Sequence, residues 1–241
     1  MGGGLFGGAR AAPLPPGTRV LAQDAYHQVF TAEGLHDVPG DGRYHRITAS
    51  TSAAPATFEH RAVPRTGHDV FRYCTVDLAR GRALPDGPLA VHVGGDFKVT
   101  SRLSGAGGGR PLELNLGVDP AVRVVDRKVT VQQQDKGLMS QTTRVDHHIA
   151  VRVRSALPEP VDVVLYDRLP VPEDEEKDLQ VALIESVPPA ERTDRDPLGE
   201  PLPGGLRWTL TVSPGGTDVL AWHYRLEFPA KAEVVGGNRR D

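Results

Sequence analysis

The chain has few of the residues that mark small secreted or membrane proteins. A single cysteine, Cys74, stands in 241 residues, which excludes an intramolecular disulfide and the disulfide-stapled secreted scaffolds. The apolar runs are short, far below the roughly 20 residues that cross a bilayer. Neither an export nor a lipidation signal is visible at the N-terminus. We therefore expect a soluble, cytoplasmic protein with no membrane insertion.

The chain also has few aromatic residues and a small net charge, whereas turn-forming residues are abundant. Lys and Arg number 28 against 31 Asp and Glu, and aromatics make up 5% with no basic patch between them, so we expect no nucleic-acid partner. Gly (27) and Pro (21) together make 48 residues, about a fifth of the chain against a background of about 12%. This composition favours many turns and few long helices, which is typical of an all-β protein.

Period-two alternation of apolar and polar residues is the main structural signal. It is clear in 145–154 and 219–228, where one face of each strand is apolar and the other polar or charged. Gly94-Gly95 between two alternating runs predicts a hairpin, because its primed turn needs positive φ values. The expected later strands lie near 127–131, 142–154, 160–167, 178–187, 205–212 and 218–228, with Trp208 and Trp222 in their core.

The alternation predicts two consecutive antiparallel β-sandwich-like modules, the second immunoglobulin-like. Their expected bounds are 20–125 and 126–232, between a flexible lead-in, 1–19, and a flexible tail, 233–241. The boundary is set near Val125, where the apolar residues change from even to odd sequence positions. This change indicates either a bulge within one strand or the meeting of two strands.

Two shorter segments need separate interpretation. Leu112, Leu114 and Leu116 predict a short strand that Gly117 closes by letting the chain reverse. Residues 173–187 fit either a helix or a strand by their apolar spacing. We favour the strand because the sequence around them is β-rich.

Residues with reactive side chains form no recognisable catalytic or metal motif. His147 and His148 are neighbours on a strand, point to opposite faces and cannot chelate one ion together. The acidic residues of 173–178 lack the glycine turn of a calcium loop, and Gly105–Arg110 lacks the residues of a phosphate loop. Cys74 is expected to be a partly buried, unreactive thiol. We therefore assign no catalytic, cofactor-binding or metal-binding residue.

Four stretches of this sequence resemble one bacterial family, the C-terminal uncharacterised domain of the mucoidy inhibitor A proteins (domain of unknown function 4139). The stretches are His36–His45, Leu114–Asp119, Pro160–Val171 and Gly204–Trp208, in the family's order. The resemblance implies a β-rich scaffold and supplies no catalytic residue. Many members of that family carry an N-terminal domain and a coiled coil, so this chain is either a stand-alone module or a fragment.

The leading functional hypothesis is a non-catalytic interaction or scaffolding module with a protein partner. A link to control of cell-envelope polysaccharide comes only from the name of the resembled family. The alternative is a hydrolase or metal-dependent enzyme that assembles His45, His92 and Asp119 at the module junction. A third hypothesis is glycan binding on exposed tyrosine rings, with Tyr26, Tyr44 and Tyr166 as candidates.

Overall fold

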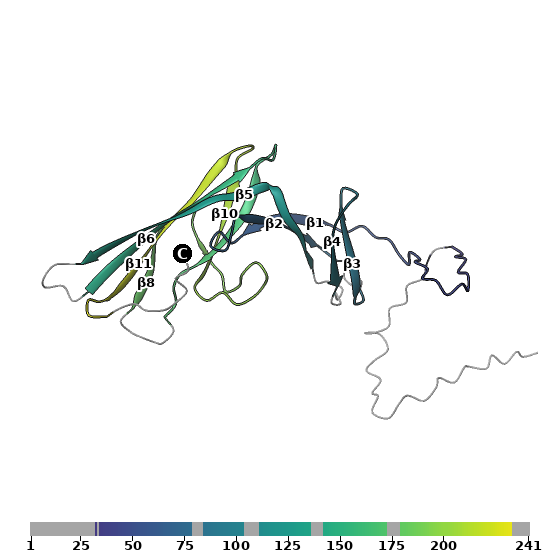
Figure 1. Ribbon diagram of the computed structural model, residues 1–241, viewed down its shortest axis with the longest axis horizontal. Helices are drawn as coiled ribbons and strands as arrows, with labels where there is room; N and C mark the ends of the chain where they lie inside the picture. The colour runs from purple at the N-terminus through teal and green to yellow at the C-terminus, as the bar shows by residue number, and fades with distance from the viewer. Residues whose placement is uncertain are drawn as a thin grey trace, which may run out of the picture. The chain divides into compact units, whose positions relative to one another are not determined.

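The computed structural model describes residues 32, 34–78, 84–103, 111–135, 142–172 and 179–232 (Figure 1). The chain divides into two units, Met1–Ala53 and Ala54–Asp241. In the described part of the first unit the backbone forms neither helix nor strand, and its side chains are largely exposed. The expected lead-in and tail, 1–19 and 233–241, lie outside the described residues.

The second unit is built from β-strands, which confirms the all-β prediction, and its described residues contain no helix. The strands are β1 (Ala56–Ala62), β2 (Asp69–Val76), β3 (Gly87–Val93), β4 (Asp96–Leu103), β5 (Leu112–Asp135), β6 (Thr142–Ser155), β7 (Val161–Arg168), β8 (Gln180–Val187), β9 (Glu191–Arg192), β10 (Gly205–Val212) and β11 (Thr217–Pro229). In the part of the chain that the structure describes, no helix is long and apolar enough to span a membrane.

The later strands occur where the alternation predicts them, and residues 180–187 form a strand rather than a helix. The helix-or-strand prediction for 173–178 falls outside the described residues. One expectation is wrong: the chain does not reverse at Gly117, because β5 continues through it. Gly117 has a φ of +90° at an irregularity in the β2–β5 register, so its backbone freedom serves a bulge inside the strand.

Within the described residues, nine strands form one mixed sheet in the order β8-β11-β6-β5-β2-β1-β7-β10-β9. The neighbouring pairs are antiparallel except β1 and β7, which run parallel. β5 is 24 residues long and pairs with β2 through its first half and with β6 through its second. The expected module boundary therefore falls inside one strand, at a register shift between Val124 and Asp126, and strands from both sides share one sheet.

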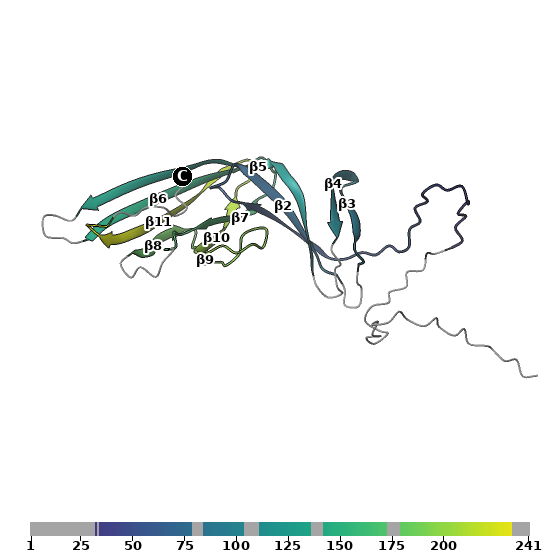
Figure 2. The ribbon, with the colours of Figure 1, turned by 60° about the horizontal axis from the view of Figure 1, so that its bottom comes forward.

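This sheet curls so that its two ends face each other across the core. β10 and β11 lie six places apart in the strand order, yet Trp208 and Trp222 have ring centroids 5.4 Å apart. The Trp208 indole Nε1 donates to Ser186 Oγ on β8 at 2.7 Å. Figure 2 shows β8 and β10 on the same side of the curled sheet, below β5 and β6. Both tryptophans are buried, at 1% and 3% exposure, as the sequence predicts.

The β3–β4 hairpin forms a second, two-stranded sheet. Its turn contains Gly94 and Gly95 with φ values of +62° and +91°, which confirms the predicted primed turn. Valines and leucines on one side of the hairpin are half-buried or buried, with Val91 at 8% exposure. The side chains on its opposite side are exposed.

Candidate functional site

The two most distinctive stretches of the family resemblance each place a carboxylate in an internal polar contact. Asp119 ends the stretch Leu114–Asp119, and its Oδ2 lies 2.9 Å from His60 Nε2 on β1. Its Oδ1 accepts a hydrogen bond from the Ala121 backbone amide at 2.9 Å. The exposed fractions of the His60 and Asp119 side chains are 9% and 14%. This pair therefore joins β1 to β5 across the intervening strand β2.

The pKa of Asp119 lies below its ordinary value. Burial acts to raise it by disfavouring the charged form, but the hydrogen bonds from His60 and the Ala121 amide outweigh that effect. Asp119 is thus ionised at neutral pH and can only accept hydrogen bonds. The His60 Nε2 atom must carry the proton of this contact. Such a pair resembles the base-and-orienter part of a catalytic triad, but within the described residues no nucleophile is hydrogen-bonded to His60.

Asp167, in the stretch Pro160–Val171, is the most buried carboxylate with two cationic partners. Its side chain is 3% exposed and accepts from Arg65 Nε at 2.9 Å and from Arg127 Nη2 at 3.3 Å. These arginines come from the loop after β1 and from β5, which lie one and three places away from β7 on the same side of it in the sheet order. The carboxylate thus ties distant parts of the curled sheet together. Both of its carboxylate oxygen atoms are engaged in these contacts.

Another polar cluster lies on the opposite face of the sheet from the tryptophans. Arg61 on β1 contacts the carboxylates of Glu59 and Glu113 at 2.8 and 2.7 Å, and its guanidinium lies 4.3 Å from the ring centroid of Tyr73. Burial acts to lower the pKa of Arg61, but the hydrogen bonds to Glu113 and Glu59 outweigh it and raise the pKa. Arg61 Nη1 also donates to the Pro197 carbonyl at 3.3 Å. The cluster therefore holds the 193–204 segment against the sheet.

Asp146 on β6 forms a third polar cluster together with β11. It accepts from His223 Nε2 at 2.8 Å and from Arg225 Nε at 2.7 Å, and its side chain is 6% exposed. Burial acts to raise the pKa of Asp146, but the hydrogen bonds from Arg225 and His223 outweigh it and lower the pKa. The His223 ring stacks on His148 with centroids 4.1 Å apart.

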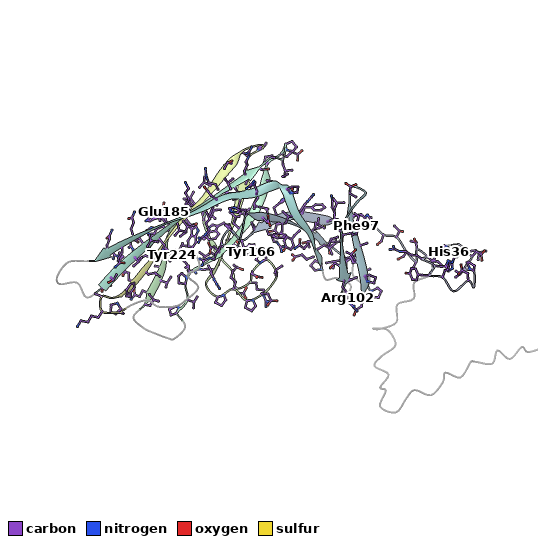
Figure 3. All side chains as sticks on the ribbon, in the orientation of Figure 1. His36, Phe97, Arg102, Tyr166, Glu185 and Tyr224 are labelled. Atoms are coloured by element: carbon purple, nitrogen blue, oxygen red, sulfur yellow. The ribbon has the colours of Figure 1, made fainter. Side chains whose placement is uncertain are left out.

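An exposed surface with mixed apolar and polar character covers one side of the β3–β4 hairpin, which we call the hairpin face. Its members alternate along β3 and continue with their cross-strand partners on β4, where a register shift separates the last two, and all are exposed: Pro88, Ala90, His92, Arg102, Thr100 and Phe97. Phe97 is 58% exposed and meets the His92 ring edge-on, with centroids 5.6 Å apart. Figure 3 labels Phe97 and Arg102 on this hairpin. Phe97 lies near the turn and Arg102 at the open end of the hairpin, and aromatic residues and arginine are both enriched in protein contact surfaces.

The enzyme hypothesis named three residues, and the structure gives each of them a different partner. His45 lies 2.8 Å from Asp41 in the first unit, His92 meets the Phe97 ring edge-on, and Asp119 pairs with His60. His92 and Asp119 lie in different sheets of the second unit. The polar partner of Asp119 is therefore His60, which the sequence hypothesis did not include.

The tyrosine candidates for glycan binding differ in exposure. Tyr166 is 7% exposed and buried in the sheet, so the hypothesis of a stacking surface is wrong at this position. Tyr44 is 90% exposed, and Tyr26 lies outside the described residues. Only Tyr44 therefore remains a described candidate for stacking on a sugar ring.

The remaining candidate residues are Cys74 and the neighbouring histidines of β6. Cys74 is buried at 7% exposure, as expected. His147 points into the core and stacks on Tyr224, whereas His148 is exposed, so the two point to opposite faces as expected. Among the described residues no three His, Cys, Asp or Glu side chains converge as a metal site. The loop 105–110 and the acidic residues 173–178 lie outside the described part of the chain.

Sequence reasoning missed the partners of the motif carboxylates. Arg65 and His60 lie 102 and 59 positions before Asp167 and Asp119 in the chain. A short motif carries no signal for such distant partners.

The curled nine-stranded sheet of the described residues defines an all-β protein, in which Asp119 and Asp167 from two of the motif stretches make contacts between strands. The family model described as a domain of unknown function (DUF4139) matches residues 8–230, so the chain belongs to this family. No curated protein and no solved structure matches the chain significantly.

Proposed function

We propose that this chain is a non-catalytic β module that binds a protein partner through its hairpin face. The observation that carries the proposal is the β3–β4 hairpin, whose two strands pair with no other strand of the described residues. A two-stranded hairpin is marginally stable in water by itself. Phe97 leaves an aromatic side chain 58% exposed on the outer face of this hairpin, and that exposure is unfavourable unless a partner covers the ring.

The composition of the hairpin face suits a protein partner. Phe97 supplies a large apolar side chain, His92 supplies a polar ring beside it, and Arg102 supplies donors at the open end of the hairpin. Interface cores are enriched in aromatic residues and arginine, and few residues carry most of the binding energy. Phe97 is accordingly the proposed anchor. The motif carboxylates Asp119 and Asp167 support the non-catalytic part of the proposal, because they are engaged inside the sheet.

Two finer proposals accompany this function. The first is that 126–232 forms an immunoglobulin-type sandwich within the curled sheet, following a separate module 20–125. The second is a role in cell-envelope polysaccharide control, supported only by the resemblance of His36–His45 and the other three stretches to the mucoidy inhibitor A family.

Affinity capture from the source cells tests the function. The tagged wild-type chain is compared with Phe97→Ser and with Val219→Ser, a matched control at an exposed apolar residue of β11. A partner retained by the wild type and by Val219→Ser, but lost by Phe97→Ser, supports the proposal. If the two variants retain the same proteins as the wild type, the hairpin face is not the binding surface. Thermal unfolding of each variant shows that the fold is unchanged.

A further inference from the structure

An arginine of β2 lies on the sheet face that carries the core. Arg72 is the direct cross-strand partner of His60, so the two side chains leave the sheet on the same face. The residues two positions before and after it, Val70 and Cys74, are buried on this face at 0% and 7% exposure. Arg72 itself is half-buried. A charged side chain in such a position normally has a carboxylate or carbonyl partner.

Arg72 has no such partner within the part of the chain that the structure describes. Its guanidinium carbon lies 4.5 Å from the ring centroid of Phe58, but none of its nitrogen atoms makes a hydrogen bond or an ion pair there. The Nε atom is enclosed by protein, whereas the two terminal nitrogen atoms are not. The fold thus provides no acceptor for this guanidinium, and its terminal nitrogen atoms are free to bind an acceptor from outside the chain.

Phe58 gives this guanidinium an open apolar neighbour. The Phe58 side chain is 52% exposed. It precedes His60, the first β1 residue that pairs with β7, so among the described residues no strand flanks β1 beside Phe58 on that side. A guanidinium that lies over an aromatic ring can still donate from its edge to a planar acceptor. The two side chains therefore present a cationic fork next to an exposed ring.

The charge around Arg72 favours a ligand with a single negative charge. Asp119 lies within electrostatic reach of Arg72, but its two oxygen atoms are engaged by His60 and by the Ala121 amide. This carboxylate would repel a dianion such as a phosphate more strongly than a monoanion. A carboxylate matches the guanidinium fork, and an apolar group attached to it would cover the Phe58 ring.

We propose that Arg72 and Phe58 bind a ligand that carries one carboxylate beside an apolar group. The carboxylate accepts from the terminal nitrogen atoms of Arg72, and the apolar group packs on the Phe58 ring. This site is separate from the hairpin face, whose members belong to β3 and β4. A free monocarboxylic acid and an acidic side chain between apolar residues of a protein both have this chemistry, and the experiment separates the two sources.

Titration of the full chain with two probes near neutral pH tests the site. The probes are hexanoate and a short acetylated, amidated peptide with one glutamate between two leucines. Binding is followed through the Nε–H resonance of Arg72 and the ring resonances of Phe58. We expect saturable shifts with a dissociation constant on the order of 1 mM, and the probe that binds more tightly identifies the source. Hexanamide, which has no charge, should give no such shifts. If neither probe shifts these resonances, or if inorganic phosphate binds more tightly than both, the proposal is overturned.

A lysine substitution tests whether the guanidinium fork is used. Arg72→Lys keeps the positive charge but loses the planar pair of donors, so it should bind the better probe about fivefold more weakly. Arg154→Lys, at an exposed arginine of β6, is the matched control and should bind as the wild type does. Equal affinity in Arg72→Lys and in the wild type would overturn the proposal.

The stability of the ligand-free chain gives an independent readout. Arg72→Met replaces an unpaired, enclosed donor by an apolar side chain of similar length. If Arg72 serves a ligand, the urea midpoint of this variant should equal or exceed that of the wild type, while binding of both probes is lost. A large fall in the midpoint would show that the guanidinium holds the fold instead, and would contradict the proposed role.

Discussion

The backbone amide of Leu169 donates a hydrogen bond of 2.9 Å to the carbonyl oxygen of Gly204. The two residues belong to two of the stretches that resemble the same family, Pro160–Val171 and Gly204–Trp208. Gly204 has a φ of +71°, and a Cβ at this position would lie 2.5 Å from the Leu169 carbonyl oxygen. The glycine is therefore required both by its backbone conformation and by the close approach of the neighbouring chain.

Gly204→Ala should destabilise the fold strongly. The new methyl group would clash with backbone atoms that cannot rotate away, in addition to the roughly 1–2 kcal/mol cost of a left-handed conformation. The matched control is Gly215→Ala, with a φ of +60° and no atom within 4 Å of the added Cβ. Urea unfolding should show a larger loss for Gly204→Ala than for Gly215→Ala. Equal losses would mean that the backbone beside Gly204 can shift.

Asp167→Ala should lower the free energy of unfolding by about 3 kcal/mol. Removing one member of a buried ion pair leaves the other charge uncompensated, which costs about 3–5 kcal/mol. We expect the lower end of this range because the side chains of Arg65 and Arg127 are 16% and 11% exposed, so water partly solvates their charges. Denaturant unfolding measures the change.

Asp126→Ala is the control for that prediction. Asp126 pairs with Arg152 at the surface, where the two side chains are 27% and 47% exposed. An exposed pair contributes little to stability, because water and salt screen its charges. If the loss in Asp167→Ala is as small as in this control, the buried pair does not hold the sheet.

Asp146→Asn should change how stability depends on pH. The folded pKa of Asp146 is below its unfolded value of about 3.9, so its ionised form stabilises the fold above that value. This contribution is lost as the pH falls through the folded pKa. The variant should thus be less stable than the wild type at about pH 7, with a smaller difference at about pH 3. Chemical unfolding at both pH values measures it, and a constant difference would contradict the shift.

Local sequence patterns predicted the strands far better than the contacts between them. Alternation over 145–154 and 219–228 identified β6 and β11, since a strand with one buried face repeats every two residues. The same pattern could not show that β1 pairs in parallel with β7, about a hundred residues later. Nor could it show that β5 passes through Gly117 and Val125 as one strand, because a bulge and a strand end leave similar sequence signals.

In the candidate sites too, the orientation of single side chains could be predicted, whereas the contacts between distant residues could not. Sequence showed that His147 and His148 point to opposite faces, which follows from strand geometry alone. It could not show that His223, 75 positions after His148, is the cross-strand partner of His148, because the β6–β11 register is a tertiary property. Asp167 was assigned to a strand end, whereas its contact with Arg65 depends on how the sheet curls.

Site-specific photo-crosslinking tests the binding role of the hairpin face most directly. A benzoylphenylalanine replaces Phe97 in one chain and Val219 in a control chain, both at exposed positions of the second unit. After irradiation in the source cells, the account predicts a discrete crosslinked protein from position 97 and none from position 219. A folded chain that gives no adduct at position 97, or the same adducts from both positions, would contradict the claim that this face binds a partner.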